Sequence, residues 1–202
     1  MKKTRLVAGV GINDSTEITW TVIDGKKIRC PFYVKWKAIL QRCYNENQHQ
    51  QRCKKGYLKN AAYIGCSISD EWIYFTKFKS WMEKQDWEGN HLDKDLLVPG
   101  NKVYGPDTCI FVPPHINYML IDQKPGKYKK GVTFDKKSNL YHIKVVVNGK
   151  QTTRGCWKTE DEAAIAFMQY KYREFCQVAE TVKDPKLKKA LYQYAKNNYE
   201  FS

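Results

Sequence analysis

Residues 91 to 95, His-Leu-Asp-Lys-Asp, carry one imidazole and two carboxylates at alternate positions. Alternate side chains of an extended chain face the same side, so His91, Asp93 and Asp95 would be presented together, with Lys94 facing away. Such a group suits phosphodiester hydrolysis, because a divalent metal neutralises phosphate charge and a base within hydrogen-bond reach activates water. The alternative is that both carboxylates pair with neighbouring Lys or Arg side chains and only stabilise the loop.

The residues that follow extend this candidate site. A glycine-containing loop leads to an expected strand at 109–112, and the paired prolines after it can start a helix that carries Asn117. Magnesium prefers a few oxygen ligands together with water, so Asp93 and Asn117 are the candidate metal ligands. A neutral imidazole can accept a proton near neutral pH, which makes His91 a candidate base. The pattern leaves open whether a carboxylate, Asp93 or Asp95, has that role instead.

Apolar spacing predicts the elements that must position this group. The segment 5–30 is typical of strands and contains an Asp24-Gly25 turn signal. Helical spacing indicates one helix over 33–45 and a second over 70–82. In the second, the residues on one helical stripe are predicted to be core: Trp72, Phe75, Phe78, Trp81 and Met82. We therefore expect an α+β fold.

The C-terminal part predicts three strands and two helices. A basic, polar stretch over 123–131 is the expected linker, and an Asn148-Gly149 hairpin signal divides the run 141–157 into two strands. A helix is expected to start at Thr159, because acids fill its first turn, and a last helix follows Pro185. In the strand 141–147, odd-numbered residues are expected to face the helix and even-numbered residues, including His142 and Lys144, the other side.

The charge of the chain indicates a polyanionic partner. The formal net charge is +14, and residues 123–202 alone hold 17 Lys and Arg against 8 Asp and Glu, a net +9. A surplus of this size most often marks a nucleic-acid-binding protein, although it can also be a solvated face. No apolar run is long enough for a bilayer and no N-terminal signal is evident, so we expect an intracellular protein with no membrane partner.

The cysteines predict neither disulfides nor a metal. There are seven, at an odd count, with no Cys-x-x-Cys pair, and most lie in apolar surroundings typical of reduced, buried thiols. A structural zinc site is conceivable from four residues: Cys43, Cys53, Cys66 and His49. Their spacing matches no familiar zinc pattern, so no structural zinc is expected.

Five segments carry a resemblance to a known family: "GVGIND" (9–14), "WKAILQRCYN" (36–45), "DEWIYFTKFKSWM" (70–82), "LDKDLLVPGNKVYGPDTC" (92–109) and "HIN" (115–117). They resemble the HNH, or ββα-metal, nucleases, and in particular a phage group of homing-endonuclease-like proteins. The resemblance implies a nuclease domain over 1–122 that uses a divalent metal, magnesium or manganese. His91 would be the base, Asn101 the structural asparagine and Asn117 the helical ligand. Asn90 stands where many members have Asp or His. This departure favours Asp93 or Asp95 over His91 in the role of catalytic base.

The segment "KGVTFDKKSNLYHIKVVVNGKQTTRGCWKTEDEAAIAF" (130–167) resembles the Apetala-type, or ethylene-response-factor, DNA-binding domain. This implies a three-stranded antiparallel sheet plus a helix over 127–180. The C-terminal helix over 181–202 is expected separately, from the helical spacing of apolar residues after Pro185. The sheet would lie in the major groove of double-stranded DNA. The candidate contacts are Lys130, His142, Lys144, Thr152 and Arg154. Most would touch phosphate, with Arg154 or Lys144 reaching a base edge.

Together these patterns predict a phage-type HNH endonuclease that works in the cytoplasm of a bacterial host. It would bind duplex DNA and hydrolyse phosphodiester bonds. One alternative is a DNA-binding or counter-defence protein that does not cleave. Another is a protein-binding module with a basic surface. Nothing in the sequence indicates an oligomeric state.

Overall fold

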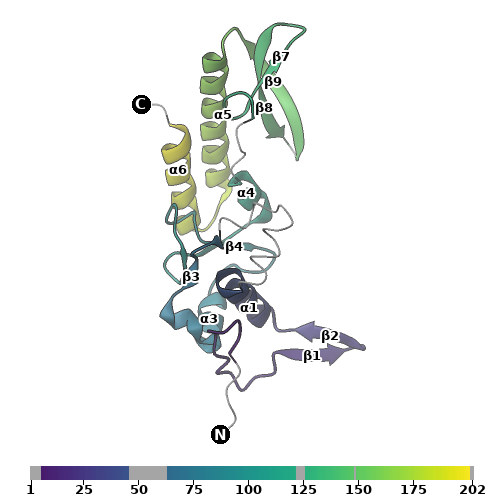
Figure 1. The fold of residues 1–202 in the computed structure, drawn as a ribbon, viewed down its shortest axis with the longest axis vertical. Helices are drawn as coiled ribbons and strands as arrows, with labels where there is room; N and C mark the ends of the chain where they lie inside the picture. The colour runs from purple at the N-terminus through teal and green to yellow at the C-terminus, as the bar shows by residue number, and fades with distance from the viewer. Residues whose placement is uncertain (1–5, 46–62, 122–125, 148, 201–202) are drawn as a thin grey trace. The chain divides into compact units, whose positions relative to one another are not determined.

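The computed structural model describes residues 6–45, 63–121, 126–147 and 149–200. The chain divides into two units, 1–113 and 114–202 (Figure 1). Both helices and small sheets are present, so the α+β class is confirmed. The division falls between Pro113 and Pro114 rather than after residue 122. The short helix α4 (Pro114–Met119) therefore counts with the second unit instead of the first.

In its described residues, 6–45 and 63–113, the first unit alternates short strands with two helices and one 3₁₀ turn. In chain order these are β1 (Trp20–Ile23), β2 (Lys26–Arg29), α1 (Pro31–Tyr44), β3 (Ser67–Ile68), η2 (Asp70–Ile73), α3 (Phe75–Met82), β4 (His91–Asp93), β5 (Val103–Tyr104) and β6 (Ile110–Val112). The strands pair as β1 with β2, β3 with β5 and β4 with β6, and only β3 and β5 are parallel. Pro31 begins α1. Proline suits this position because a backbone N–H in the first turn of a helix has no acceptor within the helix, so its absence costs no hydrogen bond.

Aromatic side chains of α1, η2 and α3 form the core of this unit. Trp36, Trp72 and Phe75 are buried, as expected from their apolar positions on the two predicted helices, and the indole nitrogen of Trp36 donates to the carbonyl of Trp72 at 2.7 Å. Trp81 is only half-buried and stacks on Phe111, with the ring centroids 5.8 Å apart. The helical stripe was therefore a correct signal for core, although Trp81 lies at its margin.

The helix predicted over 70–82 is two elements, η2 and α3, with a break at Tyr74. The break arises because the N-terminal segment pairs there, where Ile12 forms a parallel bridge with Tyr74. Asp14 then caps α3: its carboxylate accepts from the backbone N–H of Thr76 at 2.9 Å and from the Thr76 hydroxyl at 2.5 Å. Partial burial disfavours the charged form of Asp14, but the hydrogen bonds from Thr76 bring its pKa below the usual range.

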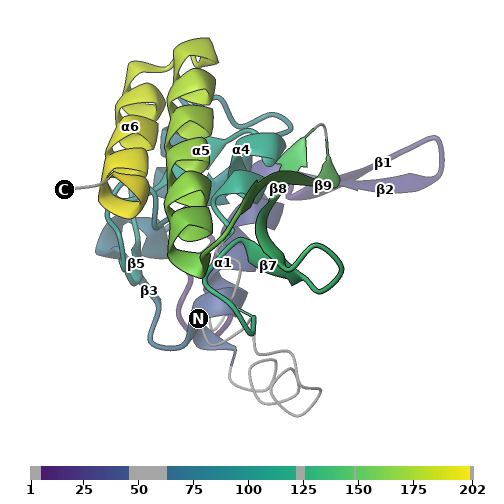
Figure 2. The ribbon, with the colours of Figure 1, turned by 90° about the horizontal axis from the view of Figure 1, so that it is seen from above.

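The second unit is a three-stranded sheet with two long helices. After α4 come β7 (Val132–Asp135), β8 (Leu140–Val147), β9 (Lys150–Trp157), α5 (Glu160–Thr181) and α6 (Pro185–Tyr199). The strands are antiparallel in the order β7-β8-β9. Val147 pairs with Lys150, which confirms the predicted hairpin at 148–149. Ile143 and Val145 of β8 are buried, and Figures 1 and 2 show α5 along one side of the sheet, with α6 beside α5.

The helices of this unit begin where the sequence predicts. Thr159 and Glu162 form a capping box at the start of α5, each side chain bonding the other's backbone N–H. The ring of Phe175 in α5 lies 5.0 Å from Tyr194 and 5.7 Å from Tyr199 of α6, so the predicted separate helix over 181–202 packs as part of this unit. Neither α5 nor any other helix in the described ranges is long and apolar enough to cross a membrane.

Two glycines of this unit differ in how closely α5 packs against them. Gly131 and Gly149 both have positive φ, 76° and 74°, but a Cβ on Gly131 would lie 2.2 Å from the Phe167 ring of α5, whereas one on Gly149 would meet nothing within 4 Å. Gly149→Ala should therefore cost about 1–2 kcal/mol of backbone strain alone. Gly131→Ala should cost about 1–3 kcal/mol more, because it also overpacks the sheet–helix contact. Thermal unfolding of the two full-length variants measures the difference, and equal melting temperatures would contradict it.

Candidate functional site

His91 and Asp93 lie on β4, which pairs with β6. His91 is opposite Val112 and Asp93 is opposite Ile110 in the antiparallel register. As alternate residues of one strand they share a face, as predicted. His91 is exposed and Asp93 is half-buried. A solvent-facing imidazole and a partly shielded carboxylate therefore stand next to each other on the end of one strand.

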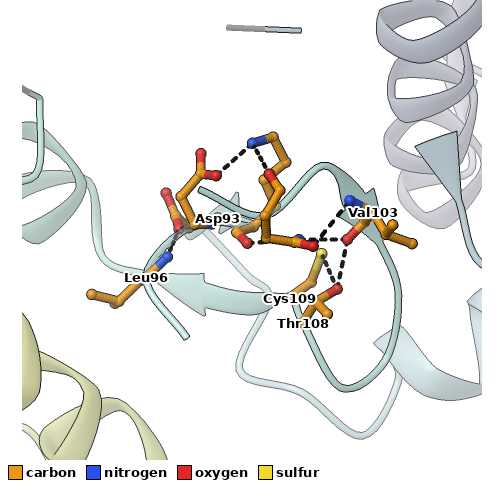
Figure 3. A network of polar contacts seen from close by, with 8 residues as sticks. Asp93, Leu96, Val103, Thr108 and Cys109 are labelled. Carbon is orange, nitrogen blue, oxygen red and sulfur yellow. Dashed lines mark hydrogen bonds and ion pairs between the residues drawn. The ribbon is translucent and has the colours of Figure 1, made fainter. Parts of the chain in front are cut away.

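Asp95 does not continue this alternation. The strand ends at Asp93, whose Oδ1 accepts from the backbone N–H of Asp95 at 2.8 Å and of Leu96 at 2.7 Å, so the chain turns (Figure 3). Lys94 does not face away from the carboxylates either. It is only 5% exposed, and its ammonium donates to the Asp95 carboxylate at 2.5 Å and to the carbonyl of Asn101 at 2.8 Å. The expectation that Asp95 stands beside His91 and Asp93 on a strand face was wrong.

Asn101 holds the loop between β4 and β5. Its amide nitrogen donates to the carbonyls of Lys94 at 3.0 Å and Val103 at 2.6 Å, and its amide oxygen accepts from the N–H of Val103 at 3.0 Å. Thr108 adds a bond from its hydroxyl to the same Val103 carbonyl at 2.7 Å (Figure 3). Asn101 therefore positions the neighbours of Asp93. Both polar atoms of its side chain are already hydrogen-bonded to backbone groups of the loop.

Cys109, next to this loop, is a buried apolar residue. Burial raises the pKa of its thiol to about 12, although hydrogen bonds with Gly105 and Thr108 oppose the shift. The thiol is therefore neutral at ordinary pH and is a poor nucleophile. Cys109 belongs to the buried core cluster of the first unit.

Asp93 is the residue best suited to a cation. Burial raises the pKa of its carboxyl, while the two backbone N–H bonds act in the opposite direction. Both of those bonds go to Oδ1, so Oδ2 has no partner among the described residues. A cation there would offset the desolvation of the carboxylate.

The two predicted metal ligands, Asp93 and Asn117, lie in different units. Asn117 lies on α4 and so belongs to the second unit, whereas Asp93 belongs to the first. In the described ranges, no three His, Cys, Asp or Glu side chains form a group that could hold an ion. Magnesium can nevertheless bind through one or two carboxylates with water completing its shell. Asp93, with His91 on the same strand face, fits that sparser arrangement.

The conceivable zinc set cannot be assembled from the described residues, because His49 and Cys53 lie outside them. Burial, and then the neighbouring Cys66, raise the pKa of Cys43 to about 12. Six of the seven cysteines, all except Cys53, lie in the described residues, and none of these six forms a disulfide there.

In the second unit, the candidate DNA contacts lie on two different faces of the sheet. Ile143 and Val145 face α5, and their partners across the β8–β9 ladder are Arg154 and Thr152. Directly paired residues share a face, so Thr152 and Arg154 lie on the helix side. Burial raises the pKa of Tyr170 on α5, and the positive charge of Arg154 opposes that shift, which agrees with this placement. The ammonium of Lys130 likewise lies 5.6 Å from the Tyr199 ring centroid of α6.

His142 and Lys144 lie on the opposite face, here called the outer face. Val146 shares this face, as expected for an even-numbered residue of β8, and the register adds three residues that the sequence analysis missed: Thr133, Gln151 and Thr153. The signal was available, because a two-residue turn at 148–149 pairs 147 with 150 and hence Lys144 with Thr153. On this face, Nδ1 of His142 donates to the carbonyl of Gly155 at 2.5 Å, which leaves Nε2 as the ring nitrogen open to a ligand.

Comparisons of the chain with protein-family models, with curated protein sequences and with solved structures found no match. Function is therefore inferred from the residues and from their geometry.

The loop of Asn101 can be tested against a matched asparagine. Asn101→Ala removes three backbone hydrogen bonds around a buried lysine, and leaving such groups unsatisfied should cost about 1–3 kcal/mol of unfolding free energy. Asn90→Ala removes a single bond, to the carbonyl of Asp86, and should cost less than about 1 kcal/mol. Urea unfolding of both variants followed by tryptophan fluorescence gives the comparison. An Asn101→Ala protein as stable as Asn90→Ala would show that the loop does not depend on this side chain.

Proposed function

We propose that the chain is a DNA-binding endonuclease of the HNH, or ββα-metal, type that hydrolyses phosphodiester bonds with a divalent metal, magnesium or manganese. The observation that carries the proposal is that His91 and Asp93 lie on the same face of β4, beside a loop fixed by Lys94 and Asn101. An exposed imidazole next to a shielded carboxylate with an unoccupied oxygen is the minimum that such chemistry needs.

The two side chains would have separate roles. Asp93 would hold the metal, with water completing its shell, and the metal would supply charge neutralisation at the phosphate. His91 would take the proton of the attacking water, because it is exposed and lies on the face of Asp93. Asn101 and Lys94 would act through the loop alone, since their polar atoms already bond to each other and to Asp95. They are positioning residues.

Duplex DNA as the substrate is supported by how the second unit uses its acids. Every carboxylate of the described part after residue 125 has a local partner: Asp135, Glu162 and Asp184 bond turn or cap N–H groups; Glu160 accepts from the Lys129 N–H; Asp161, Glu174, Glu180 and Glu200 pair with lysines. These acids neutralise only four lysines. Basic side chains without an ion pair in that part of the chain include Lys136, Lys137, Lys144, Lys150 and Arg154. The unit therefore presents its surplus positive charge to solvent.

The outer face of the sheet is the surface we assign to the DNA. The major groove admits a β-ribbon, and the face carries donors and acceptors suited to base edges and phosphates: Thr133, His142, Lys144, Gln151 and Thr153. It is the side of the sheet opposite the buried Ile143 and Val145. Lys136 and Lys137, in the turn that joins β7 to β8, are exposed at one end of it.

A second candidate function is DNA binding without cleavage. The observation that favours it is the use of the acidic and amide groups near β4 to hold the loop. Asp95 neutralises Lys94, the Asn101 side chain bonds only backbone groups, and one oxygen of Asp93 closes the turn. A protein of this kind would regulate DNA or oppose a host defence by occupying the duplex.

The outer face predicts a specific pattern of salt-dependent binding. If about six to ten phosphates are contacted, affinity for duplex DNA should fall roughly 10³- to 10⁵-fold between about 50 and 200 mM salt. Lys144→Ala should lower the slope of log affinity against log salt by about 1, because one phosphate contact is lost. Arg154→Ala, on the helix side, should change the slope less. Lys189→Ala on α6 removes an equal charge and is the control. Fluorescence anisotropy with the full chain measures all four proteins, and an Arg154→Ala effect larger than that of Lys144→Ala would refute the outer-face assignment.

The cleavage roles predict different dependences on metal concentration. His91→Ala should slow nicking of supercoiled plasmid by about 10²- to 10⁴-fold at every magnesium concentration, because the base is lost while the metal ligand remains. Asp93→Asn keeps an oxygen for the two backbone N–H groups but loses the charge, so it should require far more magnesium for the same rate. A Lys84→Ala variant controls for a charge change at an exposed site outside β4.

Three outcomes distinguish the hypotheses. Wild-type nicking by His91→Ala, together with an inactive Asp93→Asn, would make a carboxylate or a bound water the base. Nicking that survives chelation would remove the metal from the proposal. Binding to DNA with no nicking by the wild type, in magnesium or in manganese, would favour the protein that binds without cleaving.

A further inference from the structure

The β1–β2 hairpin is a two-stranded ribbon, and no other strand of the described residues pairs with it. All eight of its residues are exposed, among them Trp20 at 47% and Val22 at 57%. Asp24 and Gly25 form its turn with φ of 49° and 71°, the conformation that matches the twist of an antiparallel ribbon. Figure 1 shows the ribbon extending away from α1 and α3. An isolated pair of strands is at best marginally stable in water, so a ribbon this exposed is more than a structural spacer.

One face of the ribbon is both basic and apolar. The register pairs Trp20 with Arg29 and Val22 with Lys27, so these four side chains share that face. The ammonium of Lys27 lies 4.0 Å from the centroid of the Trp20 ring. The face and the adjoining side of α1 enclose a groove of about 430 Å³, whose lining includes Trp20, Lys27, Arg29, Tyr33, Lys37 and Gln41.

The charge around this groove is almost entirely positive. Residues 18–44 hold six Lys and Arg and a single acid, Asp24 in the turn. Lys27, Arg29 and Lys37 are exposed and form no ion pair with any described carboxylate. Lys35, on the same helix, is half-buried over the Phe111 ring, and burial lowers the pKa of its ammonium. A partner for the groove must therefore bring several negative charges.

We propose that the ribbon and the adjoining side of α1 bind duplex DNA, with Lys27, Arg29 and Lys37 on the phosphate backbone. The inference rests on the proposed function and adds to it a second DNA-binding surface, in the unit that carries His91 and Asp93. A two-stranded ribbon has the width of the major groove, and the exposed Val22 beside the turn can contact base edges.

The observations favour a duplex over the other occupants. Lys27 covers the face of the Trp20 ring, so the groove does not offer an open stacking platform of the kind that binds single strands. A second copy of the chain would bring two positively charged faces together without a matching acidic surface. An anionic membrane would attract the same lysines, and that possibility is separated by experiment.

The test removes two phosphate contacts from the groove and the same charge from elsewhere in the unit. Lys27→Ala/Lys37→Ala in the full chain should lower the slope of log affinity for duplex DNA against log salt by about 2 relative to the wild type. Lys77→Ala/Lys84→Ala, two exposed lysines on or just after α3, should leave the slope unchanged. Lys27→Arg/Lys37→Arg keeps both charges and should restore it. Circular dichroism spectra of all the variants are compared with that of the wild type to check that each variant is folded.

Each contrary result has a distinct meaning. If the wild type binds DNA and the groove variant matches the α3 variant, this inference is overturned while the proposed function stands. If the wild type has no affinity for DNA, the proposed function itself fails. Loss by the groove variant of binding to phosphatidylserine vesicles, with DNA affinity intact, would assign the groove to a membrane. Loss of a dimer in sedimentation, with DNA affinity intact, would assign it to a second copy.

Discussion

A buried ammonium organises the region around the candidate catalytic strand. Removing a charge from water costs several kcal/mol even after relaxation, so a lysine with 5% exposure needs close partners. Lys94 has two, the carboxylate of Asp95 and the carbonyl of Asn101. Asn101 in turn donates to the carbonyl of Lys94, so the two residues hold each other and the loop between β4 and β5 closes on itself. The turn that begins at Asp93 is fixed as a consequence, and with it the direction of the Asp93 carboxylate. The same arrangement explains why Asp95 is unavailable for chemistry: its charge is required to neutralise Lys94.

Many acidic side chains elsewhere in the described residues are likewise used for structure, which leaves positive charge without a local partner. In the second unit the carboxylates cap helices, close turns or pair with four lysines. In the first, Asp14 caps α3 and Glu17 pairs with Lys79. Local use of acids lowers their ability to screen the remaining Lys and Arg, so the +14 net charge is expressed on surfaces that lack ion pairs. The β1–β2 groove and the turn beside the outer face are two such surfaces. This distribution fits a polyanion better than a partner that is recognised by shape alone.

The sequence predicted what depends on neighbouring residues and missed what depends on distant ones. The start of α5 at Thr159 and the hairpin at 148–149 follow from local signals, and both are confirmed. The break at Tyr74 could not be read from residues 70–82, because it is imposed by a segment that lies about sixty residues earlier in the chain. The burial of Lys94 was hidden for a related reason: a lysine in an alternating charged run gives no sign that the strand has already ended at Asp93. The helix-side position of Arg154 differs from these cases, since counting from the two-residue turn would have predicted it.

A sparse candidate catalytic group and extended basic surfaces are physically consistent with each other. Around Asp93 few groups are free to bind a phosphodiester, because the loop consumes most of the local hydrogen-bonding capacity. Such a site gains little affinity of its own and depends on contacts remote from the reacting bond to bring the phosphate into position. Electrostatic contacts along the duplex are well suited to this, since they supply affinity without specifying sequence and leave specificity to a few base contacts. A nuclease built in this way would lose most of its activity through weakened binding when salt is raised, long before the geometry around Asp93 changed. The same reasoning holds if the strand chemistry has decayed, because the basic surfaces would then still hold the duplex and only the rate of cleavage would vanish.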